Sequence, residues 1–482
     1  MMGFAELRLT LPQQNISIRP EDVNRLSRES GQLMSSGVSF SVRPDLITTH
    51  LHNLNRMELS GDDRYLLCYK LVYQVMSETD QLRRSLSPAM LMDLNTEAGY
   101  TAKLLLKDCP SHSVEEKAQF THWVLFSLSE QIRDHYERYK TEPKTLWGEI
   151  HRIYEYAMLH RITDFKTQPL NVTIEHSYKL AIMTAASEPY HFNLTEARIL
   201  FQWLSRWSDR CTISNQISRS RNQAYFYVNL SVNEGVLSQS QSEQYLANDY
   251  AVLAINPLPL ISLVKEHMAY LKTSGKKENI GIDIAVDSVD CYVALKKAAL
   301  SWARNASRKD NREQCHEDVS LIIGLKQVHG FLKRSSKEMI RPVRGVTLNS
   351  SRGGACIEIV ESLAQNANVG DIIFENEHKN SQKLAVIKWL KRSADTILLG
   401  VEFILGKTQP VAINIKNKIT DALLVSSAQN DTLLARTGVY KNGTPFYVKI
   451  PHRQQALAAI SGPLINRHGR TDQFKIIRGN EH

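Results

Sequence analysis

The sequence predicts an α+β protein, in which a mainly helical N-terminal region is followed by antiparallel β-structure. Two observations predict this arrangement. Apolar side chains recur every three to four residues through most of residues 1–302, which is the period of helices that pack against a core. After Trp302 the period changes to two, and turn residues separate the alternating runs, as in an antiparallel barrel. The length of 482 residues is enough for two or three domains.

The helical period is clearest beyond the first sixty residues, whereas the first fifty show no clear period. Three segments are expected to begin helices: Ser60–Asp63, which has the form of a capping box, Ser113–Glu116 and Asn193–Glu196. Aromatic and aliphatic residues follow them at helical spacing, and such stripes are more typical of core packing than of a ligand groove. Before the period changes, two short strands are expected at 225–230 and 250–255, and two helices at 258–271 and 286–302.

Alternating apolar runs predict the strands of the C-terminal half. Six strand candidates follow Trp302, at 319–323, 343–348, 355–360, 371–374, 384–390 and 396–404. Beyond Gly406 three more runs have strand character, at 422–425, 446–450 and 473–477. The chain is therefore expected to have three parts: a helical region with a small β element (1–302), a six-stranded β-barrel (303–405) and a β-rich extension packed on that barrel (406–482).

Positive charge is concentrated in the C-terminal half. Residues 304–482 contain 27 Lys and Arg but only 16 Asp and Glu, a net charge of +11, while the whole chain has a net charge of +9. A basic surface favours an anionic partner, such as a phosphorylated ligand, nucleic acid or an acidic protein face. A generally basic surface without a specific partner accounts for the charge equally well.

Composition and targeting signals predict a cytoplasmic globular protein. Hydrophobic residues make up 42% of the chain and charged residues 23%. No apolar run approaches the ~18–20 residues of a membrane span, and no secretory signal is visible at the N-terminus. The six cysteines include no Cys-x-x-Cys pair, so we expect them to be reduced and structural.

The stretch from Asn349 to Val360 predicts a strand, a tight polar turn and a second strand. Asn and Ser side chains bond the backbone in such turns, and Gly353 and Gly354 can adopt positive φ. An ordinary hairpin corner accounts for this stretch taken alone. Alternatively, the turn presents Asn349 and Ser351 to a ligand, and Gly354 lets the backbone approach that ligand closely.

Arginines at every fourth position precede this stretch: Arg304, Arg308 and Arg312. Together with the strands that follow, the segment from about Arg304 to Leu405 resembles the PilZ domain, a bacterial receptor module for cyclic di-GMP. That family combines Arg-x-x-x-Arg with Asp/Asn-x-Ser-x-x-Gly on a six-stranded barrel. The matching residues here are Arg308 and Arg312, then Asn349, Ser351 and Gly354.

Later features of the segment also resemble the family, but one feature departs from it. The Val369-Gly-Asp turn, the strand that carries Trp389 and the Gly400-Val-Glu-Phe strand match the family's later strands. The gap between Arg312 and Asn349 is unusually long and contains an insertion. Arg304 and Arg308 therefore form a competing register for the arginine pair.

The resemblance implies a receptor, not an enzyme. Arg308 and Arg312 would hold phosphate and guanine groups of cyclic di-GMP, and Asn349 and Ser351 would line the other side of the ligand. No cofactor or metal is expected, because the sequence lacks a Walker-type glycine loop, a Gly-x-Ser-x-Gly elbow and a His-Glu-x-x-His motif. The output would be a changed interaction with a protein partner, for example one in a motility or surface-adhesion apparatus.

Two functions of other classes stay open. The basic barrel could bind nucleic acid, in which case affinity would fall steeply with salt across many sequences. The barrel could also serve as a scaffold that has lost its ligand. The presence of the motif residues makes both alternatives less favoured than a cyclic di-GMP receptor.

Overall fold

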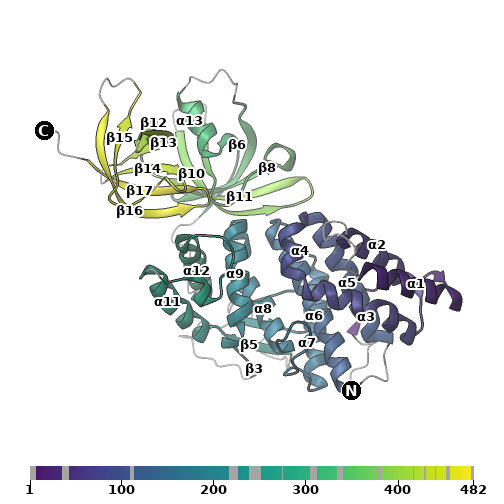
Figure 1. The fold of residues 1–482 in the computed structure, drawn as a ribbon. Helices are drawn as coiled ribbons and strands as arrows, with labels where there is room; N and C mark the ends of the chain where they lie inside the picture. The colour runs from purple at the N-terminus through teal and green to yellow at the C-terminus, as the bar shows by residue number, and fades with distance from the viewer. Residues whose placement is uncertain are drawn as a thin grey trace.

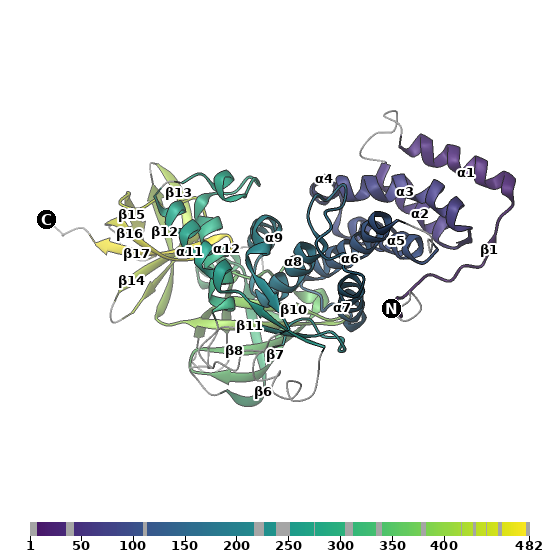
Figure 2. The same ribbon diagram turned by 90° about the horizontal axis from the view of Figure 1, so that it is seen from below.

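The computed structural model consists of a helical region that lies along one side of two β-barrels (Figure 1). The first helices lie at the end of the molecule farthest from the second barrel (Figure 2). The structure describes residues 7–34, 43–108, 113–215, 226–237, 251–273, 275–303, 312–333, 340–376, 382–415, 417–427, 430–439, 441–451 and 456–478. The α+β class and the order of its parts are as the sequence predicts.

The helices extend through most of the N-terminal region. They are α1 (Pro20–Leu33), α2 (Arg43–Asn55), α3 (Gly61–Ser77), α4 (Thr79–Ser85), α5 (Pro88–Asp108), α6 (Val114–Glu137), α7 (Lys144–Leu159), α8 (Ile174–Ala186), α9 (Leu194–Trp207), α11 (Leu258–Lys272) and α12 (Ser288–Trp302). The helices α1 and α2 lie within the first fifty-five residues, where the sequence shows no clear period. The two helices expected at 258–271 and 286–302 are α11 and α12.

Three helices begin at the residues that the sequence indicates. The side chains of Ser60, Ser113 and Asn193 each accept a hydrogen bond from the backbone N–H three residues later, at the starts of α3, α6 and α9. At Ser113 and Asn193 a glutamate completes a reciprocal capping box. These bonds satisfy N–H groups that have no partner within the helix.

The aromatic stripes of the helices form the core of the helical region. Helices α5 and α6 pack side by side, and Phe120, Trp123 and Leu128 of α6 are completely buried. Burying a large apolar side chain contributes about 1.5–3 kcal/mol to stability. The stripes therefore serve core packing, as predicted.

A small antiparallel sheet completes the helical region. Its strands are β3 (Thr212–Ser214), β4 (Phe226–Asn229) and β5 (Val252–Asn256), in the order β3-β5-β4. Strands β4 and β5 confirm the two predicted strands, and β3 adds an edge. A two-residue parallel pair, β1 (Ile16–Ser17) and β2 (Met57–Glu58), ties the N-terminal lead-in to the helices.

The first barrel contains all six predicted strands. They are β6 (Glu313–Ile323), β7 (Val343–Ser351), β8 (Gly354–Val360), β9 (Ile372–Asn376), β10 (Gln382–Arg392) and β11 (Thr396–Ile404). The strands pair antiparallel and close in the order β10-β11-β8-β7-β6-β9. Alternate residues such as Leu321, Ile357 and Leu399 fill the interior. The insertion between Arg312 and Asn349 contains α13 (Leu325–Lys333), which packs on the outside of the barrel.

The C-terminal extension is a second closed barrel with a core of its own. Its strands are β12 (Lys407–Ile415), β13 (Lys418–Ser426), β14 (Asp431–Arg436), β15 (Pro445–Lys449), β16 (Leu457–His468) and β17 (Thr471–Arg478). They close in the order β12-β13-β14-β17-β16-β15 around Ile413, Leu433 and Phe474. The extension is thus β-rich, as predicted, and it has twice as many strands as the three runs suggested.

The two barrels pack on each other through buried apolar side chains. Ile322, Phe374 and Leu384 on the outside of the first barrel meet Leu423 and Leu434 of the second, and Val328 of α13 joins the same cluster. The continuous apolar contact explains why the barrels lie side by side in Figure 1.

Polar contacts join the helical region to both barrels. The backbone N–H of Arg392 in β10 donates to the carbonyl oxygen of Tyr139, at 2.7 Å. In the second barrel, Arg467 is paired with Asp287 at 2.7 Å and with Asp290 at 3.0 Å. These contacts hold the helical region against both barrels.

Candidate functional site

The structure brings together two of the residues that the sequence singles out. Arg312 comes directly before β6, and Asn349 is in the neighbouring strand β7. The Nη1 of Arg312 donates a hydrogen bond to Oδ1 of Asn349, at 3.0 Å. Arg304 and Arg308 lie outside the described residues, so the register of the arginine pair stays a prediction.

The polar turn is shorter than the sequence predicts. Ser351 and Gly354 are paired across the hairpin, so that only Arg352 and Gly353 form the turn. Asn349 and Ser351 therefore lie on strand β7, on the same side of it because they are two residues apart. The hydroxyl of Ser351 donates to the carbonyl oxygen of Gly354, at 3.2 Å.

The sequence predicts positive φ at Gly353 and Gly354, and the structure gives a different reason for a glycine in this hairpin. Neither Gly353 nor Gly354 is among the described glycines with positive φ. A Cβ atom at Gly354 would collide with the carbonyl oxygen of Val401 in β11. Close packing of two strands is therefore the reason for a glycine at this position.

Strand pairing extends the site across the outside of the barrel. A row of directly paired residues runs from Trp389 in β10 through Gly400 in β11 and Cys356 in β8 to Asn349 in β7. Directly paired residues have their side chains on the same face. Since Ile357, which neighbours Cys356 in β8, points into the core, this row faces outward.

Trp389 lies over the glycine that is opposite to it in the next strand. A Cβ atom at Gly400 would collide with the indole ring of Trp389. The pairing of β10 and β11 is irregular between Ile387 and Trp389, and such a bulge changes the direction of a side chain. Trp389 is partly exposed, so one part of the ring packs on Gly400 and the rest is available to a ligand.

The helical region forms the opposite wall of the site. The outward barrel face and the helical region together line a cavity of about 940 Å³. The barrel residues that line it are Arg312, Ser351, Gly353, Gly354, Lys388, Trp389, Lys391, Leu398, Gly400, Val401 and Glu402. The helical wall includes Tyr136, Glu142, Trp147, Tyr190 and His191.

A single carboxylate organises the aromatic side chains of the helical wall. Glu142 accepts hydrogen bonds from the hydroxyl groups of Tyr136, at 3.1 Å, and Tyr190, at 2.7 Å, and from Nε1 of Trp147, at 3.2 Å. Burial and the negative charge of Glu142 raise the pKa of Tyr190. Its hydroxyl therefore remains a hydrogen-bond donor, and three aromatic rings are held in fixed positions beside the cavity.

Two cations in the cavity have no carboxylate partner among the described residues: Arg312 and Lys391. Lys388, in contrast, pairs with Glu402 at 3.0 Å. The ammonium group of Lys391 lies 4.6 Å from the centre of the Tyr190 ring. Burial, reinforced by nearby lysines including Lys388 and Lys391, lowers the pKa of His191 to about 4, so this side chain is neutral at pH 7.

The arrangement suits a ligand that carries both negative charge and flat rings. Arg312 and Lys391 can pair with phosphate oxygens, while Trp389 offers a ring surface for stacking. No group of three or more His, Cys, Asp or Glu side chains in the described part of the chain is arranged to hold a metal ion. No helix within the described ranges is long and apolar enough to cross a membrane.

Sequence reasoning missed several side chains of the cavity. Trp389 enters the prediction only as part of a strand, and Lys391 and Tyr190 do not enter it. The alternation Trp389-Leu390-Lys391 contained a usable signal, because Leu390 is buried in the core and its two neighbours must point outward. Nothing comparable indicated Tyr190 or Trp147, which reach the cavity only through the packing of the helical region on the barrel.

The comparison with known proteins concerns the helical region. Residues 43–219 match a family model described as the N-terminal domain of the cyclic-di-GMP receptor FimW. The match includes α2 to α9 and all five residues named above for the helical wall, Tyr136, Glu142, Trp147, Tyr190 and His191, and does not extend into the barrels. No curated protein matches the chain in a sequence search.

Proposed function

We propose that the protein is a cyclic di-GMP receptor whose ligand binds in the cavity between the first barrel and the helical region. The observation that carries this proposal is the hydrogen bond between Arg312 and Asn349, on the outward face that also presents Ser351. The match of the helical region to a domain of a cyclic-di-GMP receptor supports the same ligand independently of the barrel motif.

Each side chain has a distinct role in this proposal. Arg312 and a second arginine, Arg308 or in the other register Arg304, hold phosphate and guanine groups through charge-assisted hydrogen bonds. Asn349 is oriented by Arg312 and offers its amide to a base edge, and Ser351 offers a hydroxyl. Gly354 lines the cavity beside them, although β11 is what requires a glycine there.

The protein signals by binding and not by catalysis in this proposal. The ligand contacts the first barrel on one side and the helical wall on the other. Its affinity therefore depends on the position of the helical region relative to the first barrel. A ligand that favours one placement shifts the protein towards it, and thereby changes the surface offered to a protein partner. In this proposal the protein acts in the cytoplasm, where its messenger ligand is found.

Calorimetric titration with cyclic di-GMP tests the proposal, with cyclic di-AMP and GTP as control ligands. Arg312→Ala is expected to weaken binding roughly ten- to a hundredfold, since a hydrogen bond to a charged group contributes about 1.5–3 kcal/mol. Arg344→Ala is the matched control, because Arg344 is an exposed arginine of the same barrel that does not line the cavity. Comparing Arg304→Ala with Arg308→Ala then fixes the register.

Two outcomes would contradict the proposal. No saturable binding of cyclic di-GMP to the wild type would favour a scaffold. Binding of many nucleic-acid sequences with an affinity that falls steeply with salt would favour the nucleic-acid alternative.

A further inference from the structure

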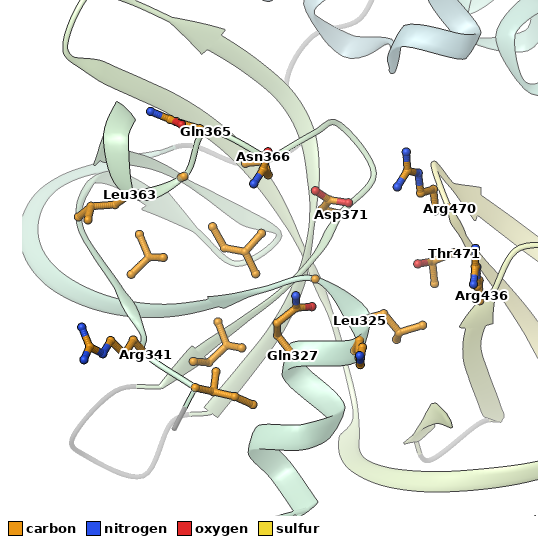
Figure 3. A pocket seen from close by; sticks show the side chains of 18 of the residues that line it. Leu325, Gln327, Arg341, Leu363, Gln365, Asn366, Asp371, Arg436, Arg470 and Thr471 are labelled. Carbon is orange, nitrogen blue, oxygen red and sulfur yellow. The ribbon is translucent and has the colours of Figure 1, made fainter. Parts of the chain in front are cut away.

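We propose that the groove between the two barrels is a docking site for an acidic, aliphatic segment of a partner protein. The groove has a volume of about 700 Å³ and lies between the first barrel, the start of α13 and the second barrel (Figure 3). None of the residues that line it also lines the cavity beside the helical region. It is therefore a second site, and its test does not depend on the identity of the ligand in the first.

Aliphatic side chains form the floor of the groove. They are Ile322, Ile323, Leu325, Ile340, Val343 and Leu363. Leu363, at the end of the short helical turn after β8, is 53% exposed. Exposed apolar side chains that gather in a hollow with a polar rim are typical of protein interaction sites. The floor therefore provides binding energy for aliphatic side chains of a partner.

Basic side chains stand at both ends of the floor. Figure 3 shows Arg341 at one end of the groove and Arg436 and Arg470 at the other, and Lys326 also lines it. Within the described part of the chain, no ion pair joins any of these four side chains to a carboxylate. Apart from the electrostatic interaction of Arg470 with Asp371, their charge is thus available to carboxylates of a partner.

Two carboxylates also line the groove and leave it with an excess of positive charge. Asp371 accepts a hydrogen bond from the backbone N–H of Asn368, at 2.9 Å, and burial raises its pKa. Asp421 lies 3.6 Å from the ring of His329. Four cations against two carboxylates favour an acidic partner, and they disfavour a basic one.

The chemistry of the lining favours a peptide over a nucleotide. No aromatic side chain is among the described residues that line the groove, so bases find no ring to stack on. The separation of Arg341 from Arg436 and Arg470 by an aliphatic floor suits carboxylates that are spaced along an extended chain. Gln327, Gln365 and Asn366 at the rim can bond the backbone of such a chain.

Selection from a phage-displayed library of random dodecapeptides on the full-length protein tests this inference. We expect the enriched peptides to combine Asp or Glu with Leu, Ile or Val. Fluorescence anisotropy with the same peptides should show weaker binding, by roughly tenfold for each arginine removed in Arg436→Ala and Arg470→Ala, since each removes a charge-assisted contact. Leu363→Ser should weaken binding through the floor without altering charge.

The controls separate the groove from the rest of the protein. Lys449→Ala and Lys475→Ala remove exposed cations of the second barrel outside the groove and should leave peptide binding unchanged. The affinity of Arg436→Ala and Arg470→Ala for cyclic di-GMP should equal that of the wild type, including the case in which the wild type does not bind it. The inference is overturned if no acidic, aliphatic peptide is enriched, if the enriched peptides bind the arginine variants as they bind the wild type, or if these variants instead lose binding of a nucleotide.

Discussion

Arg467 makes two kinds of contact, and we predict that they differ in energy. Within the second barrel its guanidinium group is paired with Asp472, at 2.7 Å, and Asp472 is completely buried. Across the interface it is paired with Asp287 and Asp290 of the helical region, whose side chains are 54% and 26% exposed. The first contact should stabilise the barrel, and the second should position it.

The magnitudes follow from burial. Arg467→Ala leaves the carboxylate of Asp472 buried without its partner, which should cost about 3–5 kcal/mol. Asp287→Asn together with Asp290→Asn removes only the partly exposed pairs, which contribute up to about 1 kcal/mol each. The asparagine at 287 still caps α12, because its side-chain oxygen can accept the bond that Asp287 accepts from the N–H of Asp290, at 2.8 Å.

Native-state hydrogen exchange can read the two effects separately. In Arg467→Ala, amides of β16 and β17 that exchange through opening of the barrel should exchange roughly a hundred- to several thousandfold faster, at about 1.4 kcal/mol for each factor of ten. In the aspartate double variant the same amides should keep nearly their wild-type rates, while the N-terminal turn of α12 exchanges faster. Lys475→Ala, an exposed cation in β17, is the control. Equal acceleration of β17 in both variants would show that docking, not the buried pair, stabilises the barrel.

Three further predictions concern the cavity, the helical core and the barrels. Trp389→Ala should weaken cyclic di-GMP binding by at least roughly fivefold, since stacking of a base contributes about 1–3 kcal/mol, and Trp389→Phe should retain most of the affinity. Equal affinity of the wild type and both variants in calorimetry would exclude stacking. Burial lowers the pKa of His122 to about 3 and that of His151 to about 4. The two neutral imidazoles therefore contribute stability above about pH 6.5, the pKa of a histidine in the unfolded chain, and this contribution is lost as the pH falls towards 4. The free energy of unfolding of the helical region, measured with denaturant, should fall between pH 6.5 and pH 4, and it should fall by less in His122→Gln. A fragment of residues 303–482 should melt cooperatively by circular dichroism. A fragment of residues 303–406 should melt at a lower temperature, because it exposes the apolar face formed by Ile322, Phe374 and Leu384. Equal melting temperatures of the two fragments would show that the second barrel does not stabilise the first.

The first barrel was predictable because each of its strands contains an apolar run, even where, as at Leu384–Ile387 of β10, the burial is continuous and does not alternate. The second barrel was harder, since three of its strands carry weak or irregular patterns. Pro410 weakens the strand pattern in the sequence of β12, and β16 contains Gly462-Pro463 and two shifts of register. Strand β14 is only six residues long. Closure of these strands into a barrel depends on pairings between distant segments, which local periodicity does not encode.

The candidate site was predictable only in part for a similar reason. The positions of Arg312 and Ser351 along the chain indicated part of one wall of the cavity, whereas Asn349 contacts Arg312 but is not among the residues that line the cavity. The position of Trp389 depends on a bulge in β10, and a shift of one residue would turn the ring to the other face. Trp147 belongs to α7, whose periodicity predicts core packing, and Tyr190 lies in the short segment between α8 and α9. The place of both residues at the cavity follows from how the helical region docks.

Arg392 lies between the cavity beside the helical region and the groove between the barrels. Its backbone N–H bonds Tyr139 of the helical region, and its Nη2 donates to the carbonyl oxygens of Gln365 and Ala367, each at 2.9 Å. Gln365 and Ala367 belong to one wall of the groove between the barrels, while Lys391, next to Arg392, reaches into the cavity beside the helices. A displacement of the helical region therefore acts on the residue that holds the groove wall. Coupling of this kind requires that the helical region has two discrete placements and that the ligand favours one of them, because contact alone transmits no free energy.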